Sequence, residues 1–144
     1  MHAQREQRLF RAGMLFAFGS AIHIFDHLRR GEQSVTESLN RLGTTGVVVQ
    51  VAVVTLILTR HRLAPIVAAA AGITLAIGFT AVHWLPPWSS LSDSFVDHRV
   101  SWFSYAASLL EIAGAVAIAI TGFAVFWKAA PEHPVGTGSE AGLP

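Results

Sequence analysis

The chain has 144 residues, of which 52% are hydrophobic and 13% are charged, and its formal net charge is +1 at pH 7. A soluble domain normally carries about 25% charged residues, so this composition indicates a membrane protein. The small net charge and the lack of a basic block with interleaved aromatics give no reason to expect nucleic acid as a partner. Because the sequence contains no cysteine, disulfides, iron–sulfur clusters and thiol chemistry are excluded.

Four apolar blocks predict membrane-spanning helices over residues 9–30, 43–60, 63–85 and 100–128. A spanning helix needs roughly 20 mostly apolar residues, which the third and fourth blocks supply easily. The second block is shorter, and the first is long enough only if its last turn is polar. We therefore predict an all-α integral membrane protein, in which residues 1–128 form a four-helix transmembrane bundle in the cell membrane.

The first predicted helix ends in the sequence AIHIFDHLRRG, where histidines and an aspartate interrupt an apolar segment. His23, Asp26, His27 and Arg30 stand at positions i, i+3, i+4 and i+7, so they share one helix face. At 1.5 Å per residue, His23 lies roughly 8 Å inside the outer boundary of the membrane. The five residues HIFDH resemble the H-x-x-E-H motif of inverted zinc metalloproteases, with Asp26 in the place of the glutamate, and no peptidase activity is inferred from them.

In the first outer loop, Ser34 and Glu37 form a capping-box pattern, which predicts a short surface helix. The sequence LPPW ends the third helix because proline cannot continue it. The second outer loop, residues 86–99, is polar. Residues 129–144 are rich in proline and glycine and are predicted to be a disordered cytoplasmic tail.

The distribution of basic residues predicts the orientation. Those on one side of the predicted bundle are Arg5, Arg8, Arg11, Arg60, Arg62 and Lys128, and those on the other side are Arg29, Arg30, Arg41 and Arg99. Since cytoplasmic loops carry an excess of Lys and Arg, the first side is predicted to be cytoplasmic. Both termini then lie in the cytoplasm.

Polar residues of all four predicted helices gather in the outer half of the membrane. They are His23, Asp26 and His27 in the first helix, Gln50 in the second, Thr80 and His83 in the third, and Ser101, Ser104, Tyr105, Ser108 and Glu111 in the fourth, with Asp97 and His98 just above. An ionisable residue inside a span is costly, and is best interpreted as part of a functional site. Glu111 is the clearest case, since it lies about ten residues inside its helix.

The first interpretation of this cluster is a transition-metal site. His23 and His27 present two imidazoles on one helix face, and His83 and Glu111 complete the ligand set from neighbouring helices. Imidazole and carboxylate together suit zinc, iron, copper or manganese and argue against calcium. Such a set leaves a coordination position open, so the protein could be a metal-dependent enzyme acting on an apolar or amphipathic small molecule. Asp26 would then be the catalytic residue that handles protons.

The second interpretation is a b-type haem in an electron-transfer subunit. A haem in a helical bundle is held by histidines on two facing helices, and His23 and His83 lie at compatible depth. Gly19 or Gly78 would make room for the macrocycle.

The third interpretation is a structural or accessory subunit without a cofactor. His23, Gln50 and Glu111 would then be hydrogen-bonding residues between helices, and Asp26 and Arg30 a helical ion pair. The partners expected from the sequence are the lipid bilayer, a small apolar ligand, and further copies of the chain or a larger membrane complex.

Overall fold

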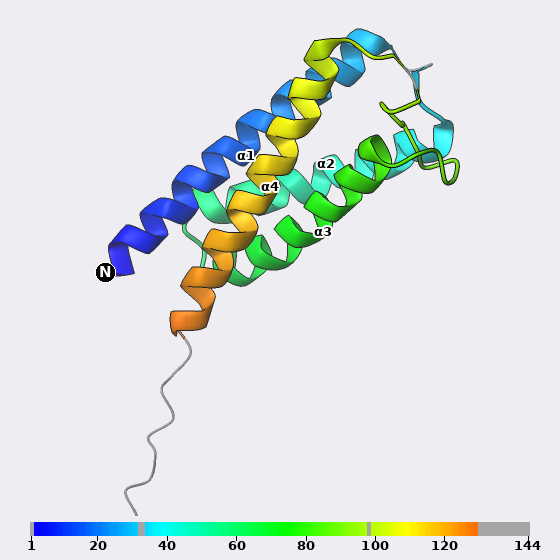
Figure 1. Ribbon diagram of the computed structural model, residues 1–144. Coiled ribbons are helices and arrows are strands. Elements are labelled where there is room, and N and C mark those ends of the chain that lie inside the picture. Colours follow the sequence, from blue (N-terminus) through cyan, green and yellow to red (C-terminus); the bar gives the residue numbers. More distant parts are fainter. Residues whose placement is uncertain (1, 32–33, 98, 130–144) are drawn as a thin grey trace, which may run out of the picture.

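The computed structural model describes residues 2–31, 34–97 and 99–129, which fold into four helices (Figure 1). These are α1 (His2–Arg30), α2 (Glu37–Leu58), α3 (Ala64–Trp84) and α4 (Trp102–Ala129). All four are long and apolar enough to cross a membrane, which confirms the prediction of an all-helical chain with four such helices. Ala129, the first residue of the predicted tail, belongs to α4, and the rest of the tail, residues 130–144, lies outside the described residues.

Two of the helix ends follow from backbone constraints. α1 stops after Arg30 because Gly31 adopts a left-handed conformation, with φ of 84°, and its N–H donates to the carbonyl of His27 at 3.1 Å. α3 stops at Trp84 because Leu85, the residue before a proline, is extended with ψ of 155°. The polar residues that precede the apolar block of α1 include no glycine or proline, so this helix begins at His2 and not at residue 9.

In the described part of the first loop, the α-helix that begins near the predicted capping box is the start of α2. The hydroxyl of Thr36 accepts a hydrogen bond from the N–H of Leu39 at 3.2 Å and caps α2, which then continues to Leu58. The N-cap is therefore Thr36 and not Ser34, and the helix continues into the second apolar block because no helix-breaking proline separates the two. Gly43 and Gly46 inside the helix weaken it without ending it.

α4 is the central packing element. It packs along both α1 and α3, whereas α2 makes fewer contacts with its neighbours (Figure 1). The close approach depends on glycine, because a Cβ atom on Gly114 would lie 2.7 Å from the Cα of Phe16 on α1. A Cβ atom on Gly72 of α3 would lie 2.6 Å from the carbonyl oxygen of Ala115. Small residues of this kind let helices pack in lipid, where apolar burial does not drive association.

The interior is apolar at one end of the bundle and polar at the other. The N-terminus of α1 and the end of α4 lie together at the apolar end (Figure 1). The buried apolar residues that form one cluster there are Leu9, Ala12, Phe16, Val53, Ile57, Ala64, Ala68, Ala115, Ile118 and Val125. The buried polar residues are Ser20, His23, Asp26, Gln50, His83, Asp93, Ser94, Ser104, Ser108 and Glu111. The functional site must therefore be sought at the end where the α1–α2 and α3–α4 connections lie.

We expect Gly114→Ala to lower the thermal unfolding midpoint in detergent, followed by the loss of helical circular dichroism. The added methyl group overlaps the backbone of Phe16, and such overpacking costs about 1–3 kcal/mol. Gly78→Ala is the matched control, since a Cβ atom there has no heavy atom within 4 Å. The control should leave the midpoint unchanged or raise it slightly, and equal midpoints for the two variants would contradict the packing described here.

Candidate metal centre

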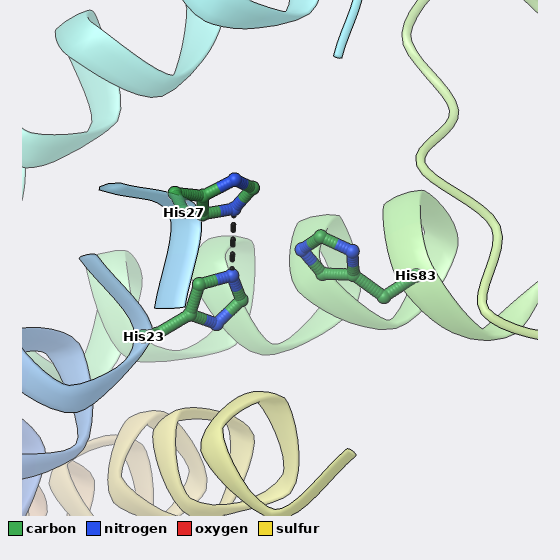
Figure 2. Close-up of side chains that lie close together, drawn as sticks. All are labelled: His23, His27 and His83. Carbon is green, nitrogen blue, oxygen red and sulfur yellow. Dashed lines mark hydrogen bonds between the residues drawn. The ribbon is translucent and has the colours of Figure 1, made fainter. Parts of the chain in front are cut away.

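Three histidines meet at the polar end of the bundle (Figure 2). His23 and His27 come from α1 and His83 comes from α3, and each offers a ring nitrogen within 4.8 Å of the others. The centroids of the His23 and His27 rings are 4.7 Å apart, and those of His23 and His83 are 4.8 Å apart. His23 and His83 are buried, whereas His27 is partly buried. Three imidazoles at these separations can hold a metal ion.

The hydrogen-bond partners of His23 and His27 on α1 indicate which of their ring nitrogens carry protons. The Nδ1 of His27 is 3.2 Å from a terminal nitrogen of Arg30, and a guanidinium can only donate. The neutral ring of His27 therefore carries its proton on Nε2, which lies 2.9 Å from the Nε2 of His23. His23 accepts this hydrogen bond, so the lone pair of its Nε2 faces the cluster (Figure 2).

His83 has the arrangement that is usual for a metal-ligating histidine. Its Nδ1 lies 3.2 Å from the backbone oxygen of Asp93, which can only accept, so Nδ1 carries the proton. The other nitrogen, Nε2, is turned toward His23 and His27 (Figure 2). Ligating histidines commonly donate their outer N–H to a carbonyl or a carboxylate, which fixes the orientation of the ring.

Glu111 lies behind His23, on the side away from His27. Its Oε2 atom is 2.7 Å from the Nδ1 of His23, although the angle of this contact is not that of a hydrogen bond. The carboxylate is only 1% exposed. The structure thus brings Glu111 to His23, as the sequence analysis expected, but against its outer nitrogen. Glu111 is therefore placed to orient His23, and it does not belong to the group of ligand atoms formed by the three histidines.

Asp26 is engaged by two arginines of its own helix. Its Oδ1 accepts hydrogen bonds from Arg29 at 2.7 and 3.1 Å, and its Oδ2 is 3.4 Å from the Nε of Arg30. Arg29 also donates to Ser101 at 2.8 Å and Ser104 at 3.3 Å, which links α1 to the start of α4. A role for Asp26 in proton transfer would therefore require the release of an arginine.

Asp93 is the carboxylate that sequence reasoning missed. It lies in the α3–α4 connection, where Arg30 binds its carboxylate through both terminal nitrogens and His83 lies 3.5 Å from its Oδ2. Burial by itself raises the pKa of Asp93, but hydrogen bonds from His83 and Arg30 and the charge of Arg30 lower the pKa well below its usual range. An aspartate between serines in a polar loop is typical of a solvated residue. The one signal of an inward fold was Phe95, two residues further on.

Residues 92–95, which we call the cap segment, fold over the outer side of His83. The N–H of Asp93 donates to the carbonyl of Val82 at 3.0 Å, and the N–H of Phe95 donates to the carbonyl of His83 at 2.9 Å. The ring of Phe95 is 4.6 Å from that of His83, measured between centroids. Tyr105 holds the segment from α4, since its hydroxyl donates to the carbonyl of Phe95 at 2.8 Å. The cap segment thereby shields the histidines from the outer surface.

The remaining residues expected at the site lie at its margin or beyond it. Gln50 is buried on α2, and its Oε1 has no hydrogen-bond partner among the described residues. Asp97 is exposed in the α3–α4 connection, and His98 lies outside the described residues.

The geometry bears on the haem interpretation. The rings of His23 and His83 contact each other with an interplanar angle of 47°, so a macrocycle between them would require the rings to separate. Gly19 does not make room for one, because a Cβ atom there would already lie 2.9 Å from the carbonyl oxygen of Leu110 on α4.

No protein-family model, no curated protein and no solved structure matches the chain. The function must therefore be argued from the site itself.

We expect Asp93→Ala to lower the free energy of unfolding by about 3 kcal/mol, because it removes one of the carboxylates that compensate the largely buried guanidinium of Arg30. Unfolding in detergent, followed by circular dichroism, measures the change. Asp97→Ala is the control, since Asp97 lies in the same connection but is exposed. A loss of stability in the control as large as that in Asp93→Ala would show that the ion pair does not fix the cap segment.

Proposed function

We propose that the protein is a multi-pass membrane protein that binds a transition-metal ion through His23, His27 and His83. The observation that carries this proposal is the convergence of three imidazoles inside a bundle of four apolar helices. Imidazole ligands suit zinc, copper and iron, and nitrogen atoms already within 4.8 Å need only small movements to reach one ion.

The balance of charge supports a bound cation. Asp26 and Asp93 are paired with arginines, whereas the partner of Glu111 among the described residues is His23. A buried carboxylate without a positive partner is strongly unfavourable in an apolar bundle. A metal ion on the Nε2 of His23 supplies positive charge through the ring, and makes its Nδ1–H a stronger partner for Glu111.

The proton between His23 and His27 is the group that such an ion replaces. In the assignment given above, this proton sits on the Nε2 of His27. When the ion binds, the proton is released or moves to Nδ1, and in the second case Arg30 leaves that nitrogen. Metal affinity should therefore fall as the pH is lowered, because protons compete with the ion for the imidazoles.

We further propose that the metal-binding protein is an enzyme. A three-histidine set leaves a coordination position open, which catalysis requires. An open apolar groove of about 350 Å³ runs between α3 and α4, and its lining residues are Ala76, Ile77, Thr80, Ala81, Leu85, Ile112 and Val116. A groove of this character suits an apolar or amphipathic small molecule that arrives from the bilayer.

The proposed orientation places both termini in the cytoplasm. The start of α1 and the end of α4 lie at the same end of the bundle (Figure 1). The exposed arginines Arg8, Arg11, Arg60 and Arg62 belong to α1 and to the α2–α3 turn at that end. This distribution of charge is the one that cytoplasmic loops show.

We expect purified protein to bind about one zinc, copper or iron ion per chain, measured by elemental analysis after dialysis against each metal. His27→Ala and His83→Ala should each weaken binding at least 10-fold, because each removes a ligand. His61→Ala is the matched control, since His61 is exposed in the α2–α3 turn. Full metal content in His83→Ala, or no binding by folded wild-type protein, would refute the proposal.

The orientation can be tested with single cysteines, because the chain has none of its own. We expect a membrane-impermeant maleimide added to intact cells to label Ser90→Cys but not Gln7→Cys, both of which are exposed positions. Gln7→Cys should react only after the cells are permeabilised. The opposite labelling pattern would reverse the orientation.

A further inference from the structure

A second group of polar side chains is buried on the inner side of the histidines. Ser20 of α1, Gln50 of α2 and Glu111 of α4 are 5%, 6% and 1% exposed, respectively. Ser20 stands one helical turn inward from His23 on the same face. None of these three residues is needed to coordinate the proposed metal ion, so their burial in an apolar bundle needs its own explanation.

Helix contacts place the three residues at one depth. A Cβ atom on Gly19, next to Ser20, would lie 3.0 Å from the backbone of Glu111. On the other side, a Cβ atom on Gly13 would lie 2.6 Å from the side chain of Ile57 on α2. Ser20 and Gln50 each stand about two helical turns outward from that contact, because α1 and α2 run in opposite directions. The three side chains therefore reach one level from three helices.

Polar atoms at this level lack partners. Within the part of the chain that the structure describes, the hydroxyl of Ser20, the Oε1 of Gln50 and the Nδ1 of His23 are buried without a hydrogen bond. The hydroxyls of Thr55 and Thr74, by contrast, donate to carbonyls of their own helices. A buried polar group without a partner loses its hydration and gains nothing in return, so such groups normally bind water or a ligand.

We propose that one ordered water molecule binds between these residues, behind His23. Water has two O–H donors and accepts two hydrogen bonds, and the group offers the matching set. The Nδ1–H of His23 and the hydroxyl of Ser20 donate to the water, which donates in turn to the Oε1 of Gln50 and to Glu111. Figure 2 shows the Nδ1 of His23 turned away from His27 and toward α4, the side from which Glu111 comes. A buried water typically makes about three hydrogen bonds, within a range of about two to four, so these partners suffice to hold one.

The contact between His23 and Glu111 does not have the angle of a hydrogen bond. The water supplies a hydrogen bond to the outer nitrogen of His23. It holds the ring so that Nε2 points to His27 and His83, and Ser20 and Gln50 act as positioning residues. This role deepens the proposed metal function and rests on it, but the water site itself does not require a metal. Loss of such an outer partner typically weakens metal binding by about 10- to 100-fold, so we expect Gln50→Leu to weaken it about 10-fold.

The experiment compares unfolding midpoints of metal-free protein, prepared with a chelator. If a water is bound, Ser20→Ala and Gln50→Leu each lower the midpoint by roughly 4–8 °C, since each leaves the water and its other partners unsatisfied. The control is Thr74→Val on α3, an exposed hydroxyl bonded to its own helix, which should shift the midpoint by less than about 2 °C. An unchanged or raised midpoint in both Ser20→Ala and Gln50→Leu would overturn the proposal, because removal of unhydrated polar groups is neutral or stabilising.

A crystal structure of the metal-free protein tests the same site if a variant fails to fold. A density peak about 2.7–3.2 Å from the Ser20 hydroxyl and the Gln50 oxygen supports the water. The lack of a peak, or a peak with the distances of about 2.3–2.6 Å typical of a bound cation, overturns it. Neither measurement involves the three-histidine metal, so a water site found in protein that binds no metal would refute the proposed function alone.

Discussion

The guanidinium of Arg30 contacts groups that the chain brings together from separate segments. It lies 3.4 Å from Asp26 on its own helix, donates to the Nδ1 of His27, and binds both carboxylate oxygens of Asp93 in the cap segment. The Arg30 side chain is only 12% exposed, so its charge must be compensated by opposite charge, and the two carboxylates supply it. Through Asp93 the same group fixes the backbone that covers His83. The position of two of the three histidines thus depends on one arginine at the end of α1.

The division of the interior explains how so polar a site can exist in such an apolar chain. At the apolar end, α4 approaches α1 and α3 closely through Gly114 and Gly72, and this packing does not depend on polar contacts. At the other end, larger polar side chains occupy the interior and bond to one another. The close-packed half therefore stabilises the arrangement of the helices, and the polar half uses that arrangement to hold histidines, carboxylates and arginines in place.

Part of this structure follows from sequence patterns, and part does not. The helices are predictable because their apolar blocks have the length that a bilayer requires, and His23, His27 and Glu111 are conspicuous because ionisable residues are costly inside such blocks. The partner of each side chain is not predictable in the same way. Whether Glu111 contacts the inner or the outer nitrogen of His23 depends on a ring rotation that helix spacing does not determine.

The cap segment shows a second limit. Its sequence is short, mostly polar and without period, so Phe95 is the one local sign that the segment turns inward. The burial of Asp93 and Phe95 results from two long-range contacts, one from Arg30 to Asp93 and one from Tyr105 to Phe95. The sequence likewise shows Arg29 only as a positive charge that bears on orientation, whereas in the structure it donates hydrogen bonds to Asp26 and Ser101. Contacts of this kind appear only when the helices are placed in space.

Ligation of one metal ion by three imidazoles can be measured directly. X-ray absorption at the K edge of that metal, in loaded and detergent-purified protein, counts these ligands directly. We expect about three imidazole nitrogens at roughly 2.0–2.1 Å from the metal, with the outer scattering of the rings. The same count should be found when His61 is replaced by alanine, because that histidine lies outside the site. A shell of oxygen atoms with one imidazole or none would contradict this ligation.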